Sequence, residues 1–184
     1  MKHSKTISST LALAYIALMA AMITICSWIS IPFAVPFTLQ TRGIFIAAGM
    51  LGARRGTLCV AVYIALGAVG LPVFSGFRGG AGVLLGATGG YILGFLPAAA
   101  LAGWLISRMG RSIPRMALCM AAGQMLCYAL GTVWFMLVYA RTSGSIGIMT
   151  ALSMCVFPFI LPDALKIILA AVIVHRTRRA VGRM

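Results

Sequence analysis

The 184-residue chain is too apolar for a soluble domain, because 62% of its residues are hydrophobic and only 9% are charged, against about 25% charged residues in soluble globular domains. Its net charge of +14 would suit a nucleic-acid-binding module, but such a module needs a basic face on a soluble fold, and here the 15 Lys and Arg residues stand almost entirely between apolar runs. We therefore expect a membrane protein that meets the anionic leaflet of a lipid bilayer and binds no nucleic acid.

Six apolar segments, separated by Pro, Gly or Arg, predict an all-α membrane protein with six transmembrane helices in a single domain, residues 1–184. The approximate segments are 10–31, 43–53, 56–71, 88–107, 115–140 and 148–174. The second and third are short, because a span normally takes roughly 20 residues. They could therefore adjoin irregular backbone or borrow flanking residues.

The first segment carries small residues along one flank. A basic start like that of a signal peptide precedes it, but the segment exceeds the roughly 7–15-residue apolar core of such peptides, so we interpret it as a retained helix. Small residues repeat in it at intervals of four and three: Thr10, Ala14, Ala17, Ala21 and Thr24. This flank could dock a partner or pack inside the bundle, since small residues let another helix approach closely.

The connection after the third segment, residues 70–80, reads GLPVFSGFRGG. Its glycines, Gly79 and Gly80 among them, would let it fold tightly over a cavity. Phe74 and Arg78 would then offer an apolar surface and a positive charge. The connection could act as a lid over a ligand, since lids draw on mobile glycine-containing loops, or it could be a plain surface connection.

The last segment contains the chain's single acidic residue, Asp163, and Lys166, the one lysine beyond the N-terminal tail. Standing three residues apart, the two share a helix face. Pro158 and Pro162 just before them favour a kink or a helix restart. Ionisable groups inside a span are costly and by default mark a substrate or ion site. A neutralising ion pair that merely fixes packing is the alternative.

The basic residues between the segments predict that both termini are cytoplasmic. With the N-terminus inside, the inner connections hold eleven Lys and Arg residues and the outer ones three, as the positive-inside rule requires for six spans. The inner set comprises Lys2, Lys5, Arg54, Arg55, Arg108, Arg111, Arg115, Arg176, Arg178, Arg179 and Arg183, and the outer set comprises Arg42, Arg78 and Arg141. Residues 70–80 would accordingly lie outside.

Catalytic and metal-binding motifs are missing from the sequence. The five cysteines stand singly in apolar stretches without a C-x-x-C pair, and His3 and His175 lie near segment ends, away from any paired serine. No lysine follows a glycine, so the G-x-x-x-x-G-K-[ST] loop for ATP is absent. We therefore expect no enzyme, no metal site, no cofactor and no ability to use ATP without other subunits.

The chain contains three further motifs: PFTLQT at 36–41, GLPVFSG at 70–76 and GATGGY at 86–91. Their order and spacing resemble those of the BioY family, the biotin-specific S components of energy-coupling-factor (ECF) transporters. Asp163 and Lys166 match that family's Asp-x-x-Lys in the last helix. The resemblance thus runs from the first helix to the sixth.

The resemblance implies a six-helix S-component fold with an outward-facing biotin pocket, partly capped by the connections between helices one and two and helices three and four. It implies multi-pass insertion in the bacterial cytoplasmic membrane and uptake that depends on a transmembrane coupling subunit and two ATPase subunits. The docking residues that it implies on the first helix are Ala14, Ala17 and Ala21. The biotin-binding residues that it implies are Thr38, Gln40, Phe74, Arg78, Gly79, Gly80, Thr88, Gly89, Tyr91, Asp163 and Lys166.

Biotin's own chemistry matches these residues. Its ureido ring offers two N–H donors and a carbonyl, so that Asp163 can accept and Lys166 can donate, and either Lys166 or Arg78 can face the carboxylate of the tail. Tyr91 and Phe74 would shield the apolar thioether ring, since small-ligand pockets are mostly apolar. Which donor meets the carboxylate stays open at this point.

The chain departs from the family's pattern at three positions. Ala87 replaces the proline that is usual in a Gly-Pro-Thr motif, Arg78 stands where a smaller polar residue can occur, and Ile92 stands where some members carry an arginine. We hypothesise that Arg78 supplies from the lid the charge that other members bring from helix four. The competing interpretations are an S component for another vitamin and a non-transport membrane scaffold.

Overall fold

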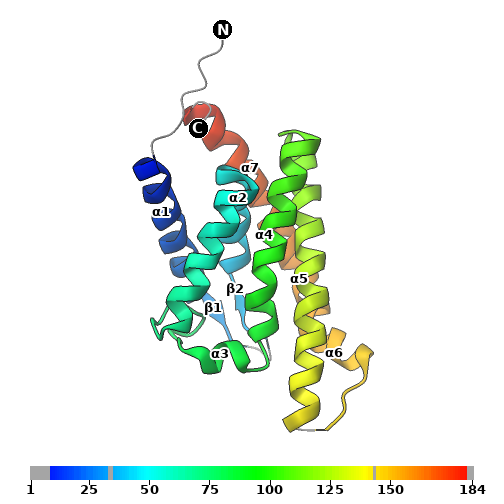
Figure 1. Ribbon diagram of the computed structural model, residues 1–184. Helices are drawn as coiled ribbons and strands as arrows, with labels where there is room; N and C mark the ends of the chain where they lie inside the picture. Colours follow the sequence, from blue (N-terminus) through cyan, green and yellow to red (C-terminus); the bar gives the residue numbers. More distant parts are fainter. Residues whose placement is uncertain (1–8, 33–34, 143, 182–184) are drawn as a thin grey trace.

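The computed structural model is a bundle of long helices with a cap of short elements at one end (Figure 1). It describes residues 9–32, 35–142 and 144–181. The elements in these ranges are α1 (Ser9–Trp28), β1 (Ser30–Ile31), β2 (Phe37–Thr38), α2 (Gln40–Ala68), α3 (Ala81–Leu85), α4 (Gly89–Met109), α5 (Ile113–Thr142), α6 (Ile148–Cys155) and α7 (Phe157–Val181). Lys2, His3, Lys5 and Arg183 lie outside the described residues.

Long apolar helices dominate this part of the chain, as the composition predicts. Five of them are long and apolar enough to cross a membrane, judged by length and composition within the residues that the structure describes: α1, α2, α4, α5 and α7. The predicted class, a mostly helical membrane protein, is therefore confirmed. The same criterion gives five spans against the six predicted segments.

The difference in number lies in α2, which contains a sharp break. Gly52 has φ 80° and ψ 179°, a left-handed conformation that favours glycine because glycine has no Cβ. The chain turns back there: the first half of α2 rises from β2 and the second half descends beside it (Figure 1). Accordingly, a Cβ on Gly56 would lie 2.7 Å from the Cα of Ala48. Segments 43–53 and 56–71 both fall mainly within α2, and each half is shorter than the roughly 20 residues of a full span.

The first and last segments end or break earlier than their apolar runs suggest. α1 stops at Trp28, and the residues after it pair in an antiparallel two-residue ribbon, Ser30 with Thr38 and Ile31 with Phe37. Such a short strand carries no detectable period, so the all-helical prediction missed it. The last segment breaks at Val156, between α6 and α7, next to Pro158.

Glycines let the helices of the bundle approach closely. A Cβ on Gly123 of α5 would lie 2.7 Å from the carbonyl oxygen of Ala98 in α4, and one on Gly103 of α4 would lie 2.8 Å from the Cα of Ala53 in α2. Small residues at such crossings are typical of membrane bundles, where close backbone packing replaces the hydrophobic effect between helices. The packing brings α4 and α5 against α2 and leaves a hollow toward the capped end.

Candidate functional site

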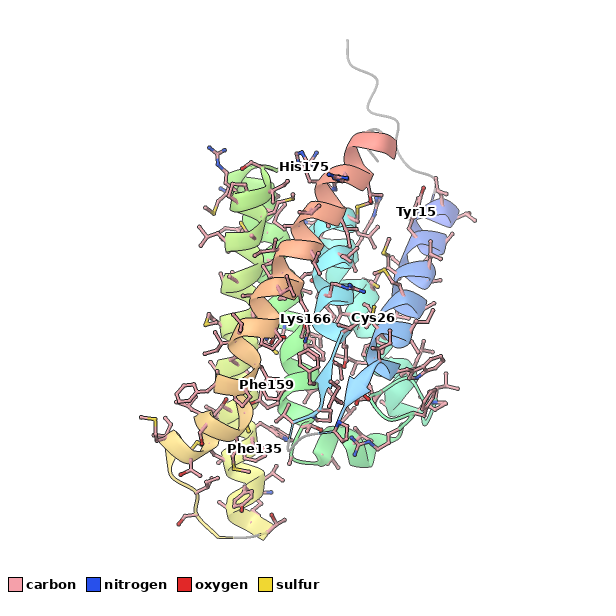
Figure 2. The ribbon with its side chains drawn as sticks, turned by 180° about the vertical axis from the view of Figure 1, so that it is seen from behind. Tyr15, Cys26, Phe135, Phe159, Lys166 and His175 are labelled. Atoms are coloured by element: carbon pink, nitrogen blue, oxygen red, sulfur yellow. The ribbon has the colours of Figure 1, made fainter. Side chains whose placement is uncertain are left out.

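A cavity lies among β2, the 70–80 connection and the capped-end halves of α4, α5 and α7. Its empty volume is about 690 Å³, which includes space open to solvent, and small-ligand pockets typically measure about 300–1,000 Å³. Figure 2 shows two of its α7 residues, with Lys166 near the middle of the bundle and Phe159 closer to α6. The predicted binding residues that line it are Thr38, Gln40, Phe74, Arg78, Thr88, Tyr91, Asp163 and Lys166.

Three predicted glycines are not part of the cavity lining; they shape the backbone beside it. A Cβ on Gly79 would overlap the carbonyl oxygen of Leu71, and one on Gly89 would overlap that of Leu84. Gly80 has φ 96° and precedes α3. These positions therefore hold the connections that carry the lining residues, and side chains there would displace them.

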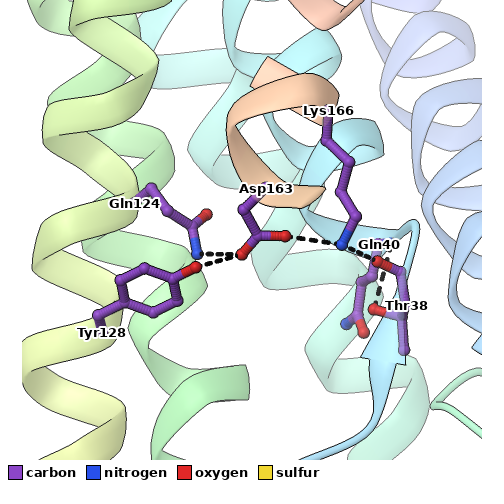
Figure 3. A network of polar contacts seen from close by, with 6 residues as sticks. All are labelled: Thr38, Gln40, Gln124, Tyr128, Asp163 and Lys166. Atoms are coloured by element: carbon purple, nitrogen blue, oxygen red, sulfur yellow. Dashed lines mark hydrogen bonds and ion pairs between the residues drawn. The ribbon is translucent and has the colours of Figure 1, made fainter. Parts of the chain in front are cut away.

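Asp163 and Lys166 form the polar end of the cavity (Figure 3). Lys166 Nζ lies 2.7 Å from Asp163 Oδ1 and donates a hydrogen bond of 2.6 Å to the carbonyl oxygen of Thr38. The other carboxylate oxygen, Oδ2, accepts from Tyr128 OH at 2.5 Å and from Gln124 Nε2 at 3.1 Å. Both charged residues are only 6% exposed. One network thus joins α7 to α5 and to β2.

The network explains how the fold tolerates these charges. A buried ion pair is usually stabilising only where further hydrogen bonds satisfy both ions, because removing the two from water costs several kcal/mol per ion. Asp163 has three donors and Lys166 has two acceptors in the described part of the chain. Lys166 Nζ also lies 3.7 Å from the ring centroid of Phe37, a cation–π contact.

Aromatic rings form the apolar walls next to this polar end. Phe37 stacks on Phe159, with centroids 6.3 Å apart and an interplanar angle of 12°. Across the cavity, Tyr91 donates to or accepts from Thr132 at 3.0 Å. A Cβ on Gly131 would overlap the Tyr91 ring, so the glycine makes room for it. The arrangement suits a ligand with a flat apolar body and one polar end.

The 70–80 connection folds back over the cavity and is tied to α1 and α2. Phe74 points inward, where it is 1% exposed and makes an edge contact with Tyr63 at 5.6 Å. Its backbone N–H donates to the carbonyl oxygen of Arg78 at 2.9 Å, which closes a tight turn. Phe77, on the outer side with φ 56°, stacks on Trp28 with centroids 4.9 Å apart. The connection therefore covers the site, as a lid would.

Arg78 lines the cavity and is exposed, so it lies where the cavity opens. Its Nε donates to the carbonyl oxygen of Ser75 at 3.1 Å, and its side chain is otherwise exposed. A guanidinium has five N–H donors in all. Arg78 can therefore give further hydrogen bonds to an anionic group at this edge.

Sequence reasoning missed two polar residues of the site, Gln124 and Tyr128. They stand four apart on one face of α5, and both contact Asp163. The signal was present, because Gln124 is a polar side chain in the middle of the apolar run 115–140, where polar groups usually have a function. Nothing in the run indicated which residue of another helix it would meet.

The fold and the site together define a polytopic helical membrane protein with a mostly apolar small-molecule pocket that ends in a buried ion pair. The chain belongs to the BioY family, whose profile matches residues 1–183. The resemblance seen in the motifs is thereby confirmed.

Individual relatives agree with this assignment. The chain is 42% identical over 160 residues to Biotin transporter BioY of Thermotoga maritima, covering 86% of this chain and 90% of that protein. It is 34% identical over 174 residues to Biotin transporter BioY2 of Lactococcus lactis subsp. cremoris, covering 94% and 90%. These relatives are transporters, in agreement with the expectation that the chain is not an enzyme.

A solved structure has the same fold. The crystal structure of the S-component for biotin from an ECF-type ABC transporter matches with a TM-score of 0.84 and 31% sequence identity. The match covers 97% of this chain and 95% of that one. The chain therefore has the S-component fold as a multi-pass membrane protein.

The hydrogen bond from Tyr128 to Asp163 should stabilise the protein more than a comparable neutral one. We expect Tyr128→Phe to lower the free energy of unfolding by about 1.5–3 kcal/mol, since the acceptor is charged, and Tyr91→Phe by about 0.5–1.5 kcal/mol, since its partner is the Thr132 hydroxyl. Thermal unfolding in detergent measures both. In a chain that also carries Asp163→Asn, Tyr128→Phe should lower the free energy of unfolding no more than Tyr91→Phe does. If the two tyrosine variants lose equal stability in the unmodified chain, the charged hydrogen bond is contradicted.

Proposed function

We propose that this chain captures biotin in the cavity and serves as the substrate-specific S component of an ECF-type ABC transporter in the bacterial cytoplasmic membrane. The observation that carries the proposal is the buried Asp163–Lys166 pair at the polar end of an otherwise apolar cavity. Its support comes from the relatives named as biotin transporters and from the fold of the solved biotin S-component.

The ureido ring of biotin fits the polar end. A cyclic urea presents N–H donors on either side of one carbonyl, and the Asp163 carboxylate and the Lys166 ammonium lie 2.7 Å apart as an acceptor beside a donor. Hydrogen bonds to such ionised groups are roughly twice as strong as neutral ones. The rings of Phe37, Tyr91 and Phe159 then cover the apolar body of the ligand.

The carboxylate tail of biotin would extend toward Arg78. This arginine lines the cavity edge, whereas position 92, which carries an arginine in some members, holds an apolar isoleucine here. A negative tail needs a cation in a pocket of low polarity. The position of Arg78 in the lining therefore supports the proposal that it faces the carboxylate.

Uptake would need further subunits. We propose a transmembrane coupling subunit and two ATPase subunits as partners, with ATP used by the latter and no cofactor bound by this chain. The exposed flank of α1 that contains Ala14, Ala17 and Ala21 would dock the coupling subunit, because these small side chains point away from the bundle while Ile16 and Ala20 are buried in it.

The proposed topology has six spans and both termini in the cytoplasm. Two of the spans are the halves of α2 on either side of Gly52. Figure 1 shows the turn within α2, the α4–α5 connection and the C-terminal end of α7 at the same end of the bundle, and these segments carry most of the arginines. That asymmetry supports an inner face at this end and a cavity that opens outward.

Direct binding tests the proposed function. The purified chain should bind labelled biotin saturably below about 1 μM, and Asp163→Asn and Lys166→Ala should each weaken binding roughly tenfold to a hundredfold by removing a charged partner. Thermal unfolding of each variant checks that it folds. Saturation by another vitamin instead of biotin would assign the chain to a sibling S component. Asp163→Asn that changed partner assembly but no ligand affinity would favour a scaffold.

The role of Arg78 can be tested by comparing biotin with an analogue that lacks the carboxylate. Arg78→Ala should weaken binding of biotin at least roughly tenfold, but hardly alter binding of the alcohol analogue that lacks the carboxylate, since only the anion gains a charge-assisted bond. Arg141→Ala, which removes an exposed arginine outside the cavity lining, is the control. Equal losses for both ligands would remove Arg78 from the carboxylate site.

A large side chain on the α1 flank tests whether the coupling subunit docks there. Ala17→Trp should prevent co-purification with the coupling and ATPase subunits, while affinity for biotin stays within about twofold, because the flank lies away from the cavity. Leu118→Trp on α5 is the matched control, since that exposed position already carries a large side chain and lies on another helix, outside the cavity lining. Retention of the complex by the Ala17 variant would exclude this flank as the docking surface.

A further inference from the structure

A second hollow adjoins the ligand cavity at its Arg78 end. It has about 660 Å³ of empty space, which includes the part open to solvent. It shares four lining residues with the cavity, Pro36, Arg78, Val83 and Thr88. The remaining wall comes from Gly82, Gly86 and Ala87. The two spaces therefore lie side by side, and Arg78 belongs to the wall that they share.

The hollow is open on the side of α3, where Gly82 is exposed and has no side chain. A Cβ placed on Gly82 of α3 would meet nothing within 4 Å. Ala87 stands where the family usually carries a bulkier proline, and the Gly86 carbonyl oxygen accepts a hydrogen bond of 2.9 Å from Trp134 Nε1 of α5. The wall is thus held in place by α5 and leaves space in front of it.

The position of this space relative to the ligand decides what it can admit. With the ureido ring at Asp163 and Lys166 and the carboxylate at Arg78, an orientation that rests on the proposed function, the carboxyl carbon lies at the entrance to the hollow. A pocket that ended at the carboxylate would be closed there by side chains. Here Arg78 stands on the border between two open spaces.

We infer that the hollow accommodates substituents attached through the carboxyl group, so that the protein also binds biotin derivatives in which the carboxylate has become a secondary amide. ε-N-Biotinyl-lysine is a simple member of this class. Its amide carbonyl still accepts a hydrogen bond from Arg78, but a neutral acceptor gains less than an anion. We therefore expect affinity about tenfold below that of biotin.

Equilibrium competition against labelled biotin tests the inference. Unlabelled biotin and ε-N-biotinyl-lysine are titrated against the purified chain, its Gly82→Leu variant and its Ala81→Leu variant. Gly82→Leu puts a side chain into the hollow. It should lower the affinity for biotinyl-lysine roughly tenfold or more, while the affinity for biotin changes by less than about twofold. Ala81→Leu adds the same side chain at the preceding exposed position, outside the lining, and should change neither affinity.

The outcomes separate the inference from the proposed function. Absence of biotin binding by the unmodified chain refutes the proposed function, and the inference with it. If biotin binds but biotinyl-lysine fails to displace labelled biotin at roughly a thousandfold excess over it, the inference alone is overturned. This outcome is measured on the unmodified chain and does not depend on whether a variant folds. Equal weakening of both ligands by Gly82→Leu also overturns it, because the hollow would then not be specific to the extended tail.

Discussion

The structure depends on the ion pair between Asp163 and Lys166, which is buried at membrane depth. An unpaired charge there would carry a large free-energy cost of desolvation, so the elements around the pair must supply hydrogen-bond partners. α5 supplies Tyr128 and Gln124 to the carboxylate, and β2 supplies the Thr38 carbonyl to the ammonium. The charges are therefore satisfied only when α5, α7 and the β1–β2 ribbon have assembled, and the same assembly creates the polar end of the cavity.

The two ends of the ligand site are built differently. The ion-pair end of the cavity lies on α5 and α7, which packing and hydrogen bonds hold in place. Sites on such rigid elements keep their geometry more precisely than sites on loops. The other end has Arg78, an exposed side chain on the 70–80 connection. That connection is anchored where Phe77 stacks on Trp28 and Phe74 packs against Tyr63. Loops vary more than helices between relatives. The Arg78 end of the cavity can thus change between relatives more readily than the ion-pair end.

Much of the fold follows from the apolar segments, and the departures have local causes. The segment predicted at 115–140 lies within α5, and the one at 88–107 begins one residue before α4 and otherwise lies within it. Long apolar runs between arginines have few other ways to satisfy their backbone in a membrane. The run at 43–71 is less regular. The chain reverses at Gly52, which has a positive φ, and packs closely against itself at Gly56. Neither feature can be predicted from the hydrophobicity of the run.

The membrane class, the Asp163–Lys166 spacing on one helix face and the motifs of the BioY family could all be predicted from the sequence, because each is a local property of the chain. The contacts of Asp163 with Gln124 and Tyr128, and those of Lys166 with Thr38 and Phe37, became visible in the folded chain alone. The same is true of Arg78, which lines two adjoining hollows. Those partners are far apart along the chain. Helix packing brings them together, and the small residues that permit this packing do not encode which helices will meet.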